Sequence, residues 1–151
     1  MQVIDEFSRT RVRLVARGEI LRTVARTTGR DGLEAGGVLV GGKAHDLIEV
    51  VEAGAPGPKA VRKPGSFLSD VEHDVWLIRR ARDRGLVPVG MWHSHPSGYR
   101  GPSRADLAAF AALRELDGDD QLMLLLVPDQ DGGFEFDGFV VSRSTARRVR
   151  L

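Results

Sequence analysis

The pattern of hydrophobic and polar residues changes its period several times along the chain, and these changes divide it into strands and helices. Period-two alternation or unbroken hydrophobicity predicts strands at Leu33–Val40, Leu47–Ala53, Leu86–His95, Gln121–Val127 and Phe134–Val141. Gln121–Val127 is apolar throughout, as expected of a strand that is buried on both faces. The glycines of Leu33–Val40 indicate that another backbone or a ligand approaches this strand closely.

Apolar residues recur at helical spacing in three other segments, Glu19–Thr28, Val71–Arg84 and Ala105–Leu116. Ser69 or Asp70 is the expected cap of the second helix, and Gly85 fits its end. Helices that interleave with strands predict an α/β fold, a single-domain mixed sheet flanked by helices on both faces. In the second helix, the residues expected to face the core are Val71, Val75 and Ile78, with Trp76 or Ala81.

Several segments give less definite signals. Residues 12–16 are either a short strand or the lead-in to a helix, and Gly41-Gly42 is the expected turn of a hairpin between two strands. Pro88 favours an edge position or an irregular start for its strand. The basic tail SRSTARRVRL either begins a helix or is a disordered end. We therefore expect a single domain over residues 1–151 with its core at about residues 10–142.

The stretch Gly54–Asp70 combines three prolines with several glycines and is predicted to be a long loop. Loops of this length in compact domains are often lids or binding loops, although a plain connector fits the same pattern. The sequence leaves both interpretations open.

Composition narrows the classes of function. The chain has 22 basic and 21 acidic residues, so its bulk charge gives no reason to expect nucleic acid or a membrane as partner. It has no cysteine, which excludes a disulfide scaffold, a thiolate zinc site and a cysteine nucleophile. No run approaches the roughly 18 apolar residues of a membrane span, and the first ten residues lack the apolar core of a signal peptide. We expect a soluble, cytoplasmic protein.

The stretch WHSHPSGYRGPSRAD, from Trp92 to Asp106, carries the candidate chemistry. If His93 and His95 share a strand face, their side chains lie roughly 6.5–7 Å apart along it and can bind one metal ion. The prolines and glycines that follow turn the chain back toward the histidines, and Asp106 then lies in the first turn of a helix. These three residues are the candidate metal ligands, and a fourth position would stay open for water.

A structural interpretation of the same residues is also available. Ser103 and Asp106 have the spacing of a helix start, in which the serine caps the helix and the aspartate favours its positive end. The two histidines could be surface residues at the end of a strand. The cap and the ligand roles are compatible, because a capping geometry would hold Asp106 in place. Trp92 and Ser94 are expected on the opposite strand face, with Trp92 in the core, and His45 and His73 match no part of the pattern.

The spacing His-x-His-x7-Ser-x2-Asp resembles the signature of the JAMM metalloproteases, also called MPN-plus or JAB domains. His93, His95, Ser103 and Asp106 match it without a gap, and Glu34 in EAGGVLVGG matches the family's upstream glutamate. In size and order the chain is similar to the compact prokaryotic branch. The resemblance implies the MPN/JAB fold, which is cytidine-deaminase-like, and one Zn²⁺ per chain. It also implies that Ser103 stabilises the oxyanion and that Glu34 acts as the general base.

The resemblance further implies a zinc isopeptidase that cuts after the C-terminal glycine of a ubiquitin-like or sulfur-carrier protein. Such an enzyme must hold an extended tail, so we expect the Gly54–Asp70 loop to be mobile when empty. Val61, Phe67 and Leu68 would then order over a bound tail. The alternatives are a RadC-like protein of DNA metabolism, which shares HSHPSG, and a non-catalytic MPN scaffold. The sequence leaves open the modifier, the bond that is cleaved, the pathway and the oligomeric state.

Overall fold

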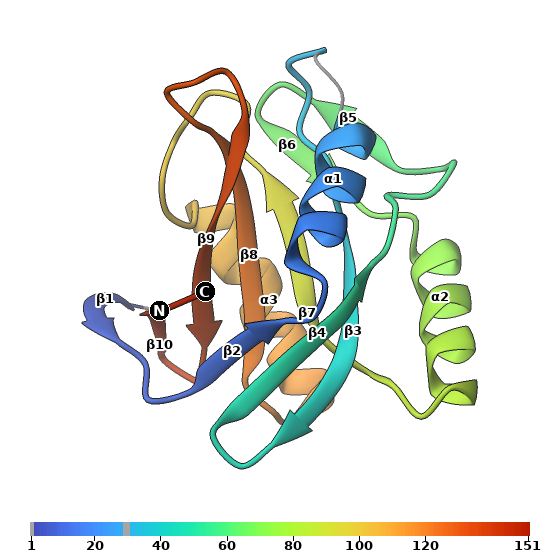
Figure 1. The fold of residues 1–151 in the computed structure, drawn as a ribbon, viewed down its shortest axis with the longest axis vertical. Coiled ribbons are helices and arrows are strands. Elements are labelled where there is room, and N and C mark those ends of the chain that lie inside the picture. Colours follow the sequence, from blue (N-terminus) through green and yellow to red (C-terminus); the bar gives the residue numbers. More distant parts are fainter. Residues whose placement is uncertain (1, 29–30) are drawn as a thin grey trace.

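The structure, a computed structural model, describes residues 2–28 and 31–151. An eight-stranded mixed sheet with the order β1-β10-β9-β8-β7-β3-β4-β2 forms its centre, and a two-stranded hairpin, β5-β6, stands beside it (Figure 1). The elements are β1 (Gln2–Phe7), β2 (Arg11–Leu14), α1 (Arg17–Thr28), β3 (Gly36–Ala44), β4 (Leu47–Ala53), β5 (Val61–Lys63), β6 (Ser66–Leu68), α2 (Val71–Asp83), β7 (Val87–Ser94), α3 (Arg104–Asp117), β8 (Gln121–Pro128), β9 (Phe134–Val141) and β10 (Thr145–Val149). This is the single-domain α/β architecture that the sequence predicts.

Strand β7 lies in the middle of the sheet, antiparallel to β3 and parallel to β8. Parallel neighbours need a crossover connection, and α3 provides it between β7 and β8. Strand β8 is buried from Gln121 to Val127, as its unbroken hydrophobicity predicts. The loop that follows β7 therefore leaves the centre of the sheet and returns as the first turn of α3.

The helices cover both faces of the sheet. Ile20 and Val24 of α1 pack with Trp92 and Leu39 in the largest hydrophobic cluster, which lies on one face. Val38 and Met91 are paired across β3 and β7, so they share the other face. Clusters on that face pack against α2 and against α3. Trp92 is 1% exposed, which confirms its predicted place in the core.

Glycines of β3 allow the close backbone approach that the sequence indicates. A Cβ atom at Gly37 would lie 2.1 Å from the Gly54 carbonyl oxygen, and one at Gly41 would lie 1.8 Å from the Glu49 carbonyl oxygen. Both positions therefore exclude any side chain. The register between β3 and β4 shifts next to Gly41, so this glycine lies at an irregularity within the strand.

The turn between β3 and β4 differs from the prediction. It lies at His45 and Asp46, where Asp46 has a φ of 57°, and Gly41-Gly42 is part of β3. The glycines there serve the close strand contact and not a reversal of the chain. Pro88 also lies in a central strand and not at an edge, but its start is irregular, because the register between β3 and β7 shifts opposite it.

The exposed face of α2 is more hydrophobic than its sequence pattern suggests. Val71, Val75 and Trp76 are 67%, 40% and 51% exposed, so the prediction that Val71 and Val75 face the core is wrong, and of the alternatives Trp76 and Ala81 it is Ala81 that faces it. Ala81 is buried, and Leu77 and Ile78 pack beside it against β3. The contact with β3 is made by the C-terminal half of the helix, which leaves the apolar residues of its first turns uncovered.

The Gly54–Asp70 stretch is not an irregular loop throughout. It contains the short antiparallel hairpin β5-β6, in which Val61 pairs with Leu68 and Arg62 with Phe67. Its first residue is fixed to the core, because Trp92 Nε1 donates a hydrogen bond to the Gly54 carbonyl at 2.8 Å. Asp70 caps α2, accepting hydrogen bonds from the amides of His73 (3.2 Å) and Lys59 (2.9 Å).

The basic tail forms strand β10, which contradicts both sequence-based alternatives, a helix start and a disordered end. It pairs antiparallel with β9 and parallel with β1. Ala146 and Val149 are buried in the sheet, while Arg147 and Arg148 are only partly covered. The two buried residues are three positions apart and belong to clusters on opposite faces of the sheet, so the segment shows no period-two pattern, and one of its partner strands, β1, lies at the opposite end of the sequence.

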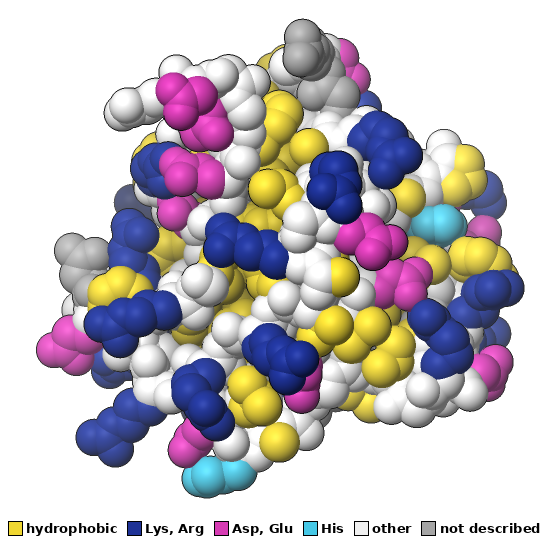
Figure 2. Space-filling model, viewed as in Figure 1, with side chains coloured by type: hydrophobic (Ala, Val, Ile, Leu, Met, Phe, Trp, Pro, Cys, Tyr) yellow, Lys and Arg dark blue, Asp and Glu magenta, His cyan; other side chains and the backbone are white. Residues whose placement is uncertain are grey.

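The surface is mixed in character. On the face shown in Figure 2, arginine and lysine side chains are interspersed with acidic and hydrophobic ones. Among the described residues, no helix combines the length and the hydropathy needed to cross a membrane.

Candidate metal site

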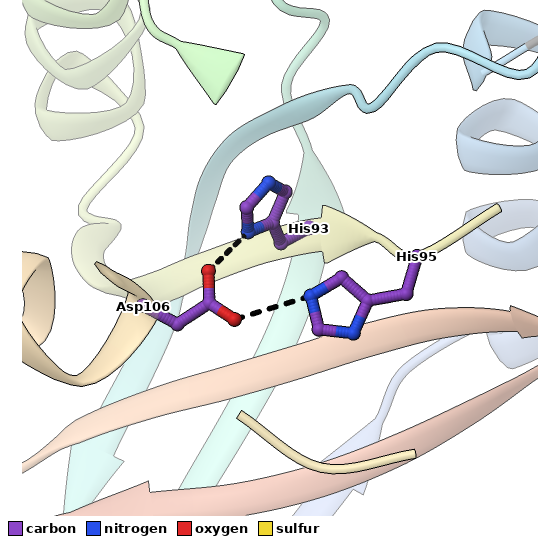
Figure 3. Close-up of side chains that lie close together, drawn as sticks. All are labelled: His93, His95 and Asp106. Atoms are coloured by element: carbon purple, nitrogen blue, oxygen red, sulfur yellow. Dashed lines mark hydrogen bonds and ion pairs between the residues drawn. The ribbon is translucent and has the colours of Figure 1, made fainter. Parts of the chain in front are cut away.

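The end of β7 and the start of α3 bring two histidines and an aspartate together. His93 lies on β7, and the His95 amide continues the pairing of that strand by donating to the Leu126 carbonyl at 2.9 Å. Gly98 and Gly101 have φ values of 79° and 113°, which let the chain turn back toward the sheet. Asp106 in the first turn of α3 then points at both imidazoles (Figure 3).

Ligand atoms of His93, His95 and Asp106 all lie within 4.8 Å of one another. Asp106 Oδ1 is 2.7 Å from His93 Nδ1, and its Oδ2 is 3.1 Å from His95 Nε2. The side chains of His95 and Asp106 are each 4% exposed and that of His93 is 16% exposed. Two imidazoles and a carboxylate converging in a buried place form a donor set that suits a divalent metal ion.

Electrostatics within the cluster favour its charged forms. Burial on its own raises the pKa of Asp106, but the hydrogen bonds from His93 and His95 outweigh burial, and the pKa lies well below its usual range. Burial likewise disfavours protonated His95, yet its hydrogen bonds to Asp106 and to the Tyr99 carbonyl raise its pKa above the ordinary value. Asp106 is therefore held as an anion, as a metal ligand must be.

Ser103 and Asp106 also form the helix cap that the sequence suggests. The Asp106 amide donates to Ser103 Oγ at 3.1 Å, and the Ser103 amide donates to Asp106 Oδ2 at 2.8 Å. This reciprocal pair is a capping box. Asp106 Oδ2 thus belongs at once to the helix cap and to the cluster with the histidines, which fixes the direction of the carboxylate.

Glu34 joins the cluster from just before β3. Its Oε2 lies 3.0 Å from His93 Nε2, and its side chain is 13% exposed. His93 Nε2 is buried and has Glu34 within ion-pair distance, but it makes no hydrogen bond with the described protein atoms. A buried ring nitrogen with unused bonding capacity, next to a cluster of three donors, fits a site that receives a further ligand.

Two residues beside the cluster, Tyr99 and Arg100, have no role in the motif that the sequence shows. The carbonyl of Tyr99 lies 3.0 Å from His95 Nδ1 and fixes that ring, which is a typical arrangement for a metal-binding histidine. Arg100 holds the same loop against β9 through ion pairs with Glu135 and Asp137. A carbonyl contact depends on backbone geometry, and the arginine's partners lie far along the chain, so neither left a local sequence signal.

Phe67 of β6 is close to the cluster from the other side. Its ring centroid is 5.7 Å from that of His93. A Cβ atom at Gly36 would lie 2.7 Å from the Phe67 ring, so the glycine provides the room for it. The hairpin β5-β6 therefore borders the candidate site, whereas its residues Val61 and Leu68 are exposed.

The other two histidines lie elsewhere. His45 is in the β3-β4 turn with a 96% exposed side chain, and His73 is on α2 beside Trp76. Within residues 2–28 and 31–151, the cluster of His93, His95 and Asp106 is the one group of three such residues close enough to hold a metal ion.

By its fold and its site, the protein is a mixed α/β domain with a largely buried His-His-Asp cluster at the end of a central strand. Residues 17–137 match the family described as prokaryotic homologs of the JAB domain. The chain belongs to this family, which confirms the resemblance drawn from the motif. A search of curated proteins finds no match.

Solved structures agree with the fold. The chain is similar to the solution structure of a Desulfitobacterium hafniense protein from structural genomics, with a TM-score of 0.68 and 20% identity. The match covers 91% of this chain and 88% of that chain. At this identity the likeness concerns the fold alone.

Proposed function

We propose that this protein is a zinc-dependent isopeptidase or peptidase that hydrolyses the bond after the C-terminal glycine of a ubiquitin-like or sulfur-carrier protein. The observation that carries the proposal is the Glu34 carboxylate 3.0 Å from His93, at the edge of the His93, His95 and Asp106 cluster. A partly buried carboxylate placed beside a candidate metal site, but outside its set of ligands, has the position of a general base.

The residues of the site divide the chemistry between them. His93, His95 and Asp106 would hold the zinc ion, which when bound lowers the pKa of a water molecule toward about 7 and polarises a carbonyl. Glu34 takes a proton from the attacking water and returns it to the leaving amine. Ser103 Oγ accepts a hydrogen bond from the Asp106 amide, and this leaves the O–H proton of Ser103 to donate to the oxyanion.

The hairpin beside the site supports an extended peptide as substrate. Strands β5 and β6 form a ladder with each other, and β5 also bonds the segment before β3 through the Lys63 carbonyl, so the outer edge of β6, which carries Phe67 next to His93, is the edge to which a peptide could add. An extended glycine-ending tail can add to such an edge as a further strand.

Exposed hydrophobic residues near the hairpin support a folded protein as the carrier of that tail. Leu68, Val71, Val75 and Trp76 are between 40% and 68% exposed and follow one another from β6 onto α2. In Figure 2, hydrophobic side chains lie among arginines over α2, on the right of the view. Exposed apolar side chains gathered on neighbouring elements are a common mark of protein binding, and these elements begin at the hairpin that borders the site.

The alternatives draw less support from these residues. A scaffold without catalysis would have no use for four convergent ionisable side chains that include the buried Asp106. A RadC-like role would rest on HSHPSG alone, which the JAB family match already accounts for.

The test uses two fusions of a ubiquitin-like protein that ends in Gly-Gly, one linear and one joined to a lysine side chain. Zinc-supplemented protein should cleave at least one of them after the last glycine, with the products identified by mass spectrometry, and a chelator should stop the reaction. If metal-loaded protein leaves both fusions and a carrier–cysteine adduct intact, the proposed function is wrong.

A further inference from the structure

Arg62 of β5 reaches across to the segment that carries Glu34. Its Nε donates to the Glu34 carbonyl at 3.0 Å. Its terminal nitrogen Nη2 donates to the Thr28 carbonyl at 2.7 Å and to the Leu33 carbonyl at 3.2 Å. The Arg62 side chain is 24% exposed, so these bonds are partly shielded from water.

Asp31 holds the far side of the same guanidinium group. Its two carboxylate oxygens lie 2.9 Å from Nη1 and 3.1 Å from Nη2 of Arg62, a bidentate pair. Asp31 also accepts a hydrogen bond from the Leu33 amide at 3.0 Å, which closes a tight turn ahead of Glu34. Arg62 is thus oriented by Asp31 while it binds three carbonyls around the glutamate.

The backbone of Glu34 is held on both sides by two consecutive residues of the hairpin. Its amide donates to the Lys63 carbonyl at 2.8 Å, and its carbonyl accepts from Arg62. With the backbone fixed in this way, the carboxylate is directed at His93. We propose that Arg62 is a positioning residue for Glu34, so that the β5-β6 hairpin sets the place of the general base as well as bordering the candidate metal site.

This inference rests on the proposed function, in which Glu34 is the base. A lysine at position 62 would keep the charge but lose the planar fork that serves four acceptor groups at once. A misplacement of a reacting group by about 1 Å can cost about 10²-fold in rate. We therefore expect Arg62→Lys to lower kcat by about 10- to 100-fold while KM and zinc content stay within about twofold of the wild type.

The decisive experiment combines kinetics with amide hydrogen exchange measured by NMR. In Arg62→Lys, exchange at the Glu34 amide should rise at least about tenfold, with or without zinc, because its segment is no longer held. Arg13→Lys is the matched control, since Arg13 lies on the edge strand β2 and makes an exposed 3.6 Å ion pair with Glu49 of β4. Arg13→Lys should change neither kcat nor the exchange rate of the Glu34 amide.

Two results would overturn the inference. One is unchanged exchange at Glu34 in both Arg62→Lys and Arg62→Gln. The other is a loss of kcat on adding Arg62→Lys to a Glu34→Gln chain that equals the loss in the wild-type chain. A residue that acts through Glu34 has nothing left to position in the Glu34→Gln chain, so the added loss there should be absent. If the wild type cleaves no substrate but the exchange responds as expected, the proposed function fails and the positioning by Arg62 stands.

Discussion

Ser94 and Ala35 exchange hydrogen bonds in both directions: the Ala35 amide donates to Ser94 Oγ at 2.8 Å, and the Ser94 amide donates to the Ala35 carbonyl at 2.8 Å. Ser94 stands between His93 and His95, and Ala35 follows Glu34. Although its side chain points away from the histidines, Ser94 therefore fixes the strand of the metal cluster to the segment of the base.

Ser94→Ala should lower the free energy of unfolding by about 1–3 kcal/mol, because it leaves the amide of fully buried Ala35 without an acceptor. Denaturant titration measures the change. Ser142→Ala is the control, since it removes a hydroxyl bond to Asp120 at 3.0 Å without stranding a buried amide. Equal losses from both variants would contradict the expectation.

His93→Ala and Asp106→Ala should abolish stoichiometric metal binding, because two remaining ligands rarely hold zinc tightly. His45→Ala, at a 96% exposed position outside the cluster, should bind metal as the wild type does. Elemental analysis after zinc addition and gel filtration measures the content. Wild-type protein without about one equivalent of metal would show that the cluster has another role.

Glu34→Ala should keep its zinc and lose turnover by about 10²–10⁴-fold, the usual contribution of a general base. The reason is that Glu34 touches the cluster through His93 without being one of the three convergent ligands. Metal analysis and kinetics on the same sample separate the two effects. Loss of zinc would move Glu34 into the ligand set, and full activity would remove it from the mechanism.

The hairpin offers a test of substrate binding that leaves Arg62 in place. Changing Val61 and Leu68 together to serine should raise KM for a ubiquitin-like substrate about tenfold, equivalent to about 1.4 kcal/mol of lost binding, with kcat unchanged. Val3→Ser is a control of equal exposure, 44% against 45% for Val61, on the edge strand β1. An unchanged KM in the double variant would place substrate recognition elsewhere. Replacing Pro58–Ser66 by a Gly/Ser bridge should lower kcat too, because it also removes Arg62.

Asp74 gives a pH-dependent prediction on α2. Burial raises its pKa, and its Oδ1 has no hydrogen-bond partner. The folded protein therefore binds this proton more tightly than the unfolded chain does, so stability falls as pH rises from the ordinary aspartate pKa of 3.8 through the raised pKa and stays lower at pH 7.

Asp74→Asn should accordingly be more stable than the wild type at pH 7, by up to about 1 kcal/mol, the low end of the cost of an unpaired buried polar group. The difference should vanish in acid, where the aspartate is protonated in both states. Thermal unfolding between pH 3 and pH 8 measures it, and Asp83→Asn, exposed on the same helix, should show no such trend. A pH-independent difference would contradict the assignment.

Local patterns predict much of the fold and of the site. His93, His95, Ser103 and Asp106 lie within fourteen positions (93 to 106), so the strand, turn and helix that join them can be read from neighbouring residues. The apolar run of β8 and the alternation of β9 are equally local. The glycines before Val38 indicate that another backbone approaches this strand closely. The Gly54 carbonyl confirms this, because a Cβ atom at Gly37 would overlap with it.

Features that depend on distant partners were missed. Strand β10 looks like a basic tail because two consecutive arginines separate Ala146 from Val149, which removes the period of a strand, and its neighbour β1 comes from the other end of the chain. The hairpin β5-β6 has strands of three residues, too short for a period, and Arg62 is held by carbonyls that have no sequence signature. Val71 and Val75 follow the helical pattern, but α2 contacts β3 through its C-terminal half, which leaves these two residues exposed.

The double use of Asp106 has a kinetic consequence. Because Oδ2 is shared between the first turn of α3 and the His95 ring, an ion bound there could be released freely only when that turn frays. The lifetime of the loaded state would then be governed by the opening rate of a helix end, and not by affinity alone. Chelators would strip the protein slowly even where equilibrium favours them.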